Sequence, residues 1–270
     1  DIDLQRYYYA IGIPMYQGYG LSEATPIISA NSPAKHIFGS SGKIVSPMEI
    51  KILDADGVEQ PFGVKGEICI KGENVMAGYW KNPKSTADTI VDGWLHTGDM
   101  GYMRDAEMLY VVGRFKSLLI AADGEKYSPE GIEENLVENS KYIDGALLHN
   151  SQDPYTIALV TPNKEALKKY AQELGLDPAS QEAKEKMLLL IESEVNAYRK
   201  GGKFAGAFPD RWLPAAICVL PEPWTEQNHF LNSSMKVVRG RVEEAYKENM
   251  AYAYTTEGKS IINKMNLASL

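Results

Sequence analysis

Alternating apolar and polar positions in the first 113 residues predict short, half-buried strands. Met48, Ile50 and Ile52 alternate with charged residues, and the alternation recurs over residues 67–71. Residues 108–112 are a third strand candidate, which ends at Gly113. Glycines and an Asp-Gly pair separate these runs and are typical of turns. The pattern therefore predicts a β-rich first segment that ends near residue 113.

The pattern changes in the residues that follow. A short apolar run over residues 118–122 predicts a strand, and the triplet that starts at Ser128 predicts the beginning of a helix. Ser128 is a favourable N-cap, and Pro129 is favourable at the first helical position because its missing N–H has no partner there. We therefore expect a helix from Pro129 onward.

Helical and strand patterns alternate in the rest of the chain. Apolar residues recur every three or four positions over residues 180–200, which predicts one amphipathic helix, and residues 237–249 predict a final helix. Apolar runs between these helices predict strands over residues 143–148, 155–160 and 216–220. Strands mixed with helices predict a compact α+β domain.

Composition and charge exclude some classes of function. The 270 residues carry a formal net charge of -8, and 44% of them are hydrophobic. A packed core is therefore expected, and a duplex-binding surface is not, because nucleic acids need a basic face. No apolar run approaches the roughly 18 residues that a spanning helix needs. Cys69 and Cys218 lie far apart without neighbours at zinc-site spacing, so each is expected to be a small buried residue in a reducing, cytoplasmic setting.

The first candidate site lies in residues 17–23. Gly20 allows close approach of a ligand to the backbone, Tyr19 offers a ring for stacking, Ser22 a hydroxyl for a phosphate, and Glu23 a carboxylate for Mg²⁺. Taken alone, such a segment is more often a turn. A second cluster, residues 66–80, predicts a strand, a loop and an aromatic anchor at Trp80, with packing favoured over ligand contact.

A third cluster, residues 93–99, places Asp99 after a glycine. A carboxylate held in a glycine-bounded turn can accept both hydroxyls of a ribose, although ordinary Asx turns are common. His96 in this segment is expected to be a structural turn residue, not a catalytic base. Arg114 follows closely and could reach a ribose or phosphate, or could be an ordinary solvated charge.

Two further candidates lie later in the chain. Gly124 is in a predicted turn where a narrow ligand could pass the backbone. Lys236 precedes the final predicted helix and suits a charge that develops on oxygen during acyl transfer, although an isolated lysine is usually a surface residue. Ser233 or Ser234 is expected to cap that helix.

The order and spacing of these clusters resemble the C-terminal series of motifs in the adenylate-forming superfamily. That superfamily includes acyl-CoA synthetases, firefly luciferase and the adenylation domains of peptide synthetases. The match runs over residues 16–162 and resumes over residues 232–241. The resemblance implies that a carboxylate attacks ATP to give acyl-AMP and pyrophosphate, and that the CoA thiol then displaces AMP.

The resemblance also implies roles for particular residues. Tyr19 and Gly20 would lie at the adenine, Ser22 at a phosphate, and Glu23 at Mg²⁺, with a role in catalysis. Two further residues, Asp99 and Arg114, would hold the ribose. Three later residues complete the set: Lys116 as hinge, Gly124 on the pantetheine path of CoA, and Lys236 as the adenylation lysine.

A domain organisation follows from the same resemblance. Residues 1–114 would be the C-terminal portion of a large AMP-binding domain, a β-rich remnant with a distorted β-barrel. Residues 115–270 would be a small, mobile α+β domain with a helical insertion over about residues 163–214. The superfamily's Ser/Thr/Gly-rich phosphate loop is expected upstream of Tyr16, and no such segment is present, so the chain is expected to be a fragment that is inactive alone.

The insertion and the bulky Met235 before Lys236 resemble the long-chain fatty-acid–CoA ligases. ATP, a fatty acid and CoA are the expected partners, and the protein is expected in the cytoplasm in a free or membrane-peripheral form. Two alternatives stay open at the level of the sequence. One is an adenylating enzyme that loads the thiol of a carrier protein, and the other is a decayed, non-catalytic relative.

Overall fold

The computed structural model describes residues 2–270 and all of their side chains except that of Lys116. The chain forms two compact units, Asp1–Ser117 and Leu118–Leu270. The predicted domain boundary, between residues 114 and 115, lies three residues before this division. The expected hinge residue, Lys116, is in the short 3-10 helix η2 (Phe115–Ser117), and its side chain lies outside the described part of the structure.

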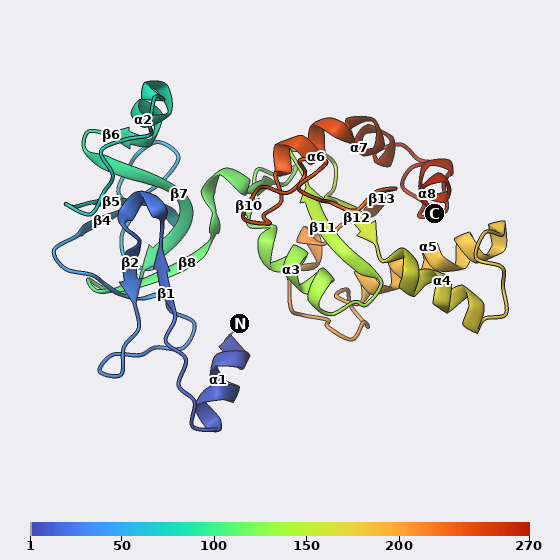
Figure 1. The fold of residues 1–270 in the computed structure, drawn as a ribbon, viewed down its shortest axis with the longest axis horizontal. Helices are drawn as coiled ribbons and strands as arrows, with labels where there is room; N and C mark the ends of the chain where they lie inside the picture. Colours follow the sequence, from blue (N-terminus) through green and yellow to red (C-terminus); the bar gives the residue numbers. More distant parts are fainter. Residues whose placement is uncertain (1) are drawn as a thin grey trace. The chain divides into compact units, whose positions relative to one another are not determined.

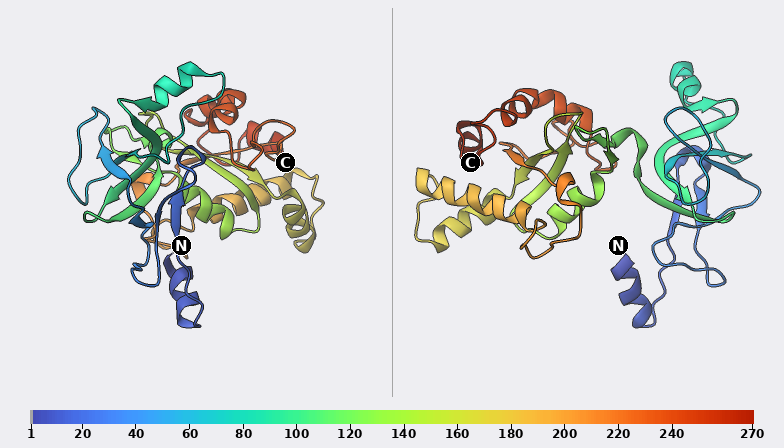
Figure 2. Two further views of the ribbon diagram at one scale, coloured as in Figure 1. Left: turned by 60° about the vertical axis from the view of Figure 1, so that its left-hand side comes forward. Right: turned by 180° about the vertical axis from the view of Figure 1, so that it is seen from behind.

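The first unit is built on an eight-stranded antiparallel sheet, which Figure 2 shows from two sides. Its strands follow the order β1-β2-β3-β8-β7-β5-β4, and β6 pairs with β7. The strands are β1 (Gly18–Gly20), β2 (Ile27–Ala30), β3 (Gly42–Ile44), β4 (Glu49–Leu53), β5 (Gly66–Lys71), β6 (Ile90–Val91), β7 (Trp94–Met103) and β8 (Met108–Arg114).

Two helices and a helical turn complete the first unit. They are α1 (Ile2–Ala10), the 3-10 helix η1 (Ser22–Ala24) and α2 (Pro83–Thr89). Helix α2 begins where the sequence favours it, because the Asn82 side chain accepts a hydrogen bond from the Ser85 N–H and Pro83 occupies the first turn. Figure 1 shows α1 projecting away from the strands of this unit.

Alternation along the strands divides this sheet into two faces. Ile68, Ile70 and Leu95 are at most 1% exposed and belong to the core of the unit. Their neighbours Glu67, Cys69 and His96 therefore point to the other face. The strands predicted over residues 48–52, 67–71 and 108–112 are confirmed by β4, β5 and β8.

The second unit is a three-layer arrangement around the sheet β11-β12-β13. Strands β11 (Ile143–His149) and β12 (Ile157–Pro162) are antiparallel, and β13 (Ala216–Val219) pairs with β12 in parallel. Both faces are buried. Leu148, Val160 and Ile217 belong to one apolar cluster, whereas Leu147, Leu159 and Cys218 belong to another.

Helices cover both faces of this sheet (Figure 1). They are α3 (Glu130–Glu138), α4 (Lys164–Glu173), α5 (Gln181–Asn196), α6 (Arg239–Ala245), α7 (Lys247–Ala253) and α8 (Lys264–Ser269), with the 3-10 helix η3 (Asp210–Trp212). A short hairpin of β9 (Leu119–Ile120) and β10 (Lys126–Tyr127) precedes α3.

Three expectations about helix ends are wrong. Helix α3 begins at Glu130 with Pro129 at the N-cap, and the Ser128 hydroxyl is buried without a partner among the described residues. The predicted final helix over residues 237–249 is two helices, because Tyr246 leaves helical geometry between α6 and α7. Ser233 and Ser234 lie in the loop before α6 and do not cap it.

The predicted α+β class is confirmed. The predicted distorted β-barrel is not: within residues 2–117 the sheet is open, because its end strands β1 and β4 do not pair with each other. None of the helices in the described residues is long and apolar enough to cross a bilayer.

Candidate active site

Three of the predicted nucleotide residues meet in the first unit. Tyr19 donates a hydrogen bond from its hydroxyl to Asp99 Oδ2 at 2.6 Å, and Arg114 Nε lies 3.3 Å from Asp99 Oδ1. Asp99 is only 6% exposed, whereas Tyr19 is half-buried and Arg114 is exposed. The cluster therefore presents a buried carboxylate with a ring on one side and a cation on the other.

The sheet brings these residues together from positions that are far apart in the sequence. Asp99 on β7 stands directly opposite Arg114 on β8. The pairing of β7 with β5 is irregular between His96 and Met100. This stretch includes Gly98, whose φ of 71° is in the left-handed region that glycine tolerates. The expectation that Asp99 and His96 lie in a turn is wrong, because both residues belong to strand β7, in which His96 pairs with Cys69 of β5 and Asp99 with Arg114 of β8.

Gly20 allows β1 to approach the chain that leads into β2. A Cβ at this position would overlap the carbonyl oxygen of Pro26. The glycine is therefore required by the close approach of two backbone segments, which also fixes where the Tyr19 ring enters the cluster.

Burial dominates the electrostatics of the cluster. Desolvation, followed by the hydrogen bond to Asp99, raises the pKa of the Tyr19 hydroxyl far above its ordinary value. The phenol therefore stays protonated and acts as a donor toward the carboxylate. A ribose hydroxyl that binds Asp99 would share an acceptor that Tyr19 already uses.

Glu23 lies in η1, and its Oε1 accepts a hydrogen bond from the Tyr79 hydroxyl at 2.9 Å. One carboxylate with a free face is the kind of protein ligand that Mg²⁺ takes together with substrate phosphates, so the predicted metal role fits the donor chemistry. Ser22 is exposed at the start of the same 3-10 helix. The expectation of a packed aromatic anchor at residues 78–80 is wrong, because Trp80 is 87% exposed and Tyr79 is 37% exposed.

The two remaining candidates belong to the second unit. Gly124 lies in the β9–β10 hairpin with a φ of 86°, and no atom lies within 4 Å of the position that a Cβ would take. The space beside its backbone is therefore open. Glycine is favoured at position 124 because of its positive φ, and not because a side chain would meet other atoms there.

Lys236 is presented at the end of a tight loop. Asn232 closes the loop, because its N–H donates to the Lys236 carbonyl at 2.9 Å and its Oδ1 accepts from the Lys236 N–H at 2.9 Å. Met235 has a φ of 59° and is 68% exposed. The loop backbone is therefore well defined while the lysine side chain is exposed.

A partly buried ion pair, to which no sequence pattern assigns a role, holds the residues that follow this loop. Arg239 donates to both oxygens of Glu133 at 2.7 and 2.8 Å and to the Leu148 carbonyl at 2.6 Å. Burial raises the pKa of Glu133, against the opposing effect of Arg239. The two partners are 106 positions apart, so no local pattern could have paired them.

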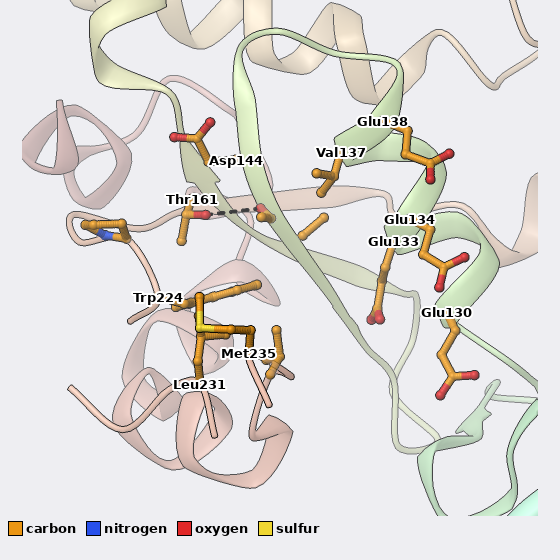
Figure 3. A pocket seen from close by; sticks show the side chains of 14 residues that line it. Glu130, Glu133, Glu134, Val137, Glu138, Asp144, Thr161, Trp224, Leu231 and Met235 are labelled. Carbon is orange, nitrogen blue, oxygen red and sulfur yellow. Dashed lines mark hydrogen bonds between the residues drawn. The ribbon is translucent and has the colours of Figure 1, made fainter. Parts of the chain in front are cut away.

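A cavity of about 490 Å³ lies beside the lysine loop (Figure 3). Met235, Leu231 and Trp224 form an apolar wall, and the carboxylates of α3, including Glu130 and Glu134, lie along the opposite side. Like charges repel, so these walls do not suit the phosphates of a nucleotide.

Cys69 has no neighbour at zinc-site spacing along the chain, but the structure places His96 and Glu67 close to it in space. Cys69 Sγ lies 3.5 Å from His96 Nδ1, which is 2.8 Å from Glu67 Oε2. Spacing along the chain could not reveal this group because it spans two strands. Cys218 is buried, as expected, and burial raises its pKa to about 12.

Comparison with known proteins shows similarity to acyl-activating enzymes and CoA ligases. The model of the family described as "AMP-binding enzyme" matches residues 2–80. A probable acyl-activating enzyme 16 of Arabidopsis thaliana is 30% identical over 93% of this chain and 36% of its own length. A 2-succinylbenzoate–CoA ligase of Bacillus cytotoxicus is 41% identical over 53% of this chain and 30% of its own. The human long-chain-fatty-acid–CoA ligase 1 is 30% identical over 92% of this chain and 35% of its own length.

Solved structures agree on the fold. The adenylation domain of a carboxylate reductase from Mycobacterium chelonae superposes with a TM-score of 0.72 at 24% identity, covering 93% of this chain and 36% of that one. An O-succinylbenzoate CoA synthetase from Bacillus subtilis, in complex with ATP and magnesium, superposes with a TM-score of 0.64 at 26% identity. The match covers 90% of this chain and 44% of that one.

The fold is thus that of adenylation domains. The match to the family model covers residues 2–80, and the similarity to acyl-activating enzymes and CoA ligases extends over most of the chain. The chain spans about a third of the length of the curated relatives that it matches.

Proposed function

We propose that this chain is part of an ATP-dependent fatty-acid–CoA ligase that forms acyl-AMP and pyrophosphate and then transfers the acyl group to CoA. The observation that carries the proposal is the buried Asp99 carboxylate with Tyr19 and Arg114 as its partners. A carboxylate in a sheltered site is a strong acceptor for the paired hydroxyls of a ribose, because charge-assisted hydrogen bonds strengthen where water is excluded.

The remaining residues divide the other tasks of the reaction. In this proposal Ser22 binds a phosphate, and Glu23 holds a magnesium ion that would neutralise phosphate charge when bound. Lys236 stabilises the negative charge on oxygen as the carboxylate attacks, and rotation at Lys116 then brings Gly124 to the pantetheine arm of CoA. The open space beside Gly124 supports this last role.

We propose a long-chain fatty acid as the acid substrate. Support comes from the similarity to the human long-chain ligase and from the helical segment that contains α4 and α5. Aromatic acids are the competing class, because 2-succinylbenzoate ligases are also among the similar proteins.

Lys236→Ala tests the two half-reactions separately. The variant is made in a protein that contains this chain together with the N-terminal part found in its longer relatives. We expect pyrophosphate release to fall about 10²–10³-fold, which is typical when a group that stabilises developing charge is removed. Thioester formation from supplied acyl-AMP should change little. Lys186→Ala, at an exposed position on α5, is the matched control. Equal losses in both half-reactions would contradict the role of Lys236.

A substrate screen tests the rest of the proposal. Pyrophosphate release should be highest with long-chain acids, and the product should form with free CoA. Activity only with a carrier-protein thiol would identify the other acceptor, and absence of ATP binding would identify a non-catalytic relative. The 270-residue chain alone should show no turnover, because it lacks the Ser/Thr/Gly-rich phosphate loop and so loses the positioning that supplies much of the rate.

A further inference from the structure

The group of Glu67, Cys69 and His96 has the composition of a metal site. One ligand-type atom of each residue lies within 4.8 Å of the others. Thiolate, imidazole and carboxylate together are typical of Zn²⁺, which binds three protein ligands where a fourth position stays open to water. This group lies outside the Tyr19–Asp99–Arg114 cluster.

The strands fix this arrangement. Cys69 on β5 stands directly opposite His96 on β7, and Glu67 is two residues earlier on the same face of β5. The ladder between the two strands is irregular over this stretch, since Glu67 pairs with Met100 and Cys69 with His96. Extra residues on β7 therefore turn the His96 ring toward the Glu67 carboxylate, as bulges often re-aim side chains.

The distance between the sulfur and the ring nitrogen matches the requirement of zinc, and the distance between the ring nitrogen and the carboxylate is shorter than zinc requires. Bond lengths of about 2.3 Å to sulfur and 2.0–2.1 Å to nitrogen place the two atoms about 3.6 Å apart in a tetrahedral site. Cys69 Sγ and His96 Nδ1 are 3.5 Å apart. His96 Nδ1 and Glu67 Oε2 are 2.8 Å apart and would have to separate by about 0.5 Å, because a metal would replace the hydrogen bond between them.

A supporting contact and a route for the ion complete the site. Glu67 Oε1 accepts a hydrogen bond from the Gly98 N–H at 3.1 Å, which orients the carboxylate as outer partners do in metal sites. The side chains of Glu67 and His96 are 12% and 27% exposed, whereas Cys69 is fully buried. His96 and Glu67 therefore form the solvent-facing side of the group, and Cys69 its buried side.

We propose that Glu67, Cys69 and His96 are the ligands of a divalent metal ion, and that this ion is Zn²⁺. Binding converts the Cys69 thiol to a thiolate and releases one proton to solvent, while His96 binds as the neutral ring. An occupied site links β5 to β7 three residues before Asp99.

Cobalt substitution tests the site directly in the reduced 270-residue chain. Titration with Co²⁺ should give one equivalent of a species with tetrahedral visible bands and a thiolate-to-cobalt charge-transfer band, and Zn²⁺ should displace it. Cys69→Ala should remove the charge-transfer band, and His96→Gln should weaken cobalt binding by at least about tenfold. The His96 variant also covers the case in which the buried Cys69 variant does not fold.

Matched controls use the other cysteine and another histidine. Cys218→Ala and His149→Gln should leave the spectrum unchanged, because these side chains belong to the second unit. Absence of a charge-transfer band in the unaltered chain would overturn the proposal. Loss of the band in Cys218→Ala but not in Cys69→Ala would also overturn it. Both readouts are independent of ligase activity.

Discussion

At the scale of single residues, Asp99 shows how this chain keeps a charge inside the protein. A buried carboxylate is costly unless it is paired and hydrogen-bonded. Arg114 supplies the opposite charge and Tyr19 the hydrogen bond. If Asp99 binds a ribose as proposed, a ribose hydroxyl would have to join or displace the Tyr19 hydroxyl at this carboxylate.

Gly20→Ala should lower the free energy of unfolding of the chain by about 1–3 kcal/mol, as overpacking usually does. The reason is the overlap between the new methyl group and the Pro26 carbonyl oxygen. Denaturant unfolding followed by circular dichroism measures the change. Gly240→Ala, where a Cβ meets no atom within 4 Å and the residue lies in α6, should be neutral or slightly stabilising. Equal stability of the two variants would contradict this account.

The candidate site was partly predictable from the sequence. Tyr19, Asp99 and Arg114 stand out as polar residues beside glycines, and the sheet brings these three together. The group around Cys69 and the pair of Glu133 with Arg239 were missed. In both cases the partners come from different strands or helices, and such contacts leave no signal in local spacing.

At the scale of elements, period-two and helical patterns predicted where most strands and helices lie but not where the helices end. Helix α5 begins where the pattern over residues 180–200 predicts, with Ser180 as the N-cap that accepts a hydrogen bond from the Ala183 N–H, but it ends at Asn196 instead of residue 200. Ser128 does not cap α3 as predicted, because its hydroxyl is buried and bonds to no backbone N–H of the helix among the described residues. Local propensity therefore gives the element, and packing decides its ends.

Helix α5 offers two adjacent leucines in opposite environments. Leu188 is fully buried, whereas Leu189 is 43% exposed. Leu188→Ala should lower the free energy of unfolding by about 2–5 kcal/mol because it leaves a cavity in the core of the second unit. Leu189→Ala should stay within about 0.5 kcal/mol of the unaltered protein. Thermal and urea unfolding of both variants give the comparison, and similar losses would show that α5 is oriented differently.

At the scale of the whole molecule, each apolar cluster draws its residues from one unit. The cluster that contains Ile68 and Leu95 belongs to residues 1–117. The two clusters on either face of the β11-β12-β13 sheet belong to residues 118–270. Each unit therefore has a core of its own, which is the physical requirement for independent folding.

Residues 118–270 expressed alone should fold cooperatively. The expected result is a single sigmoidal thermal transition and dispersed amide signals in a nitrogen–proton correlation spectrum. The Leu188→Ala change, made in this shorter protein, should cost as much as it does in the whole chain, because its contacts lie in one unit. A collapsed spectrum without a cooperative transition would show that the second unit depends on the first.

The parallel pairing of β13 with β12 has a consequence for biosynthesis. Residues 163–215 separate the two strands, and they include α4 and α5. A nascent chain on the ribosome therefore displays β12 with one unpaired edge until β13 emerges, and exposed edges are templates for aggregation. The translation of these intervening residues is the interval in which we expect the growing polypeptide to depend most on a chaperone.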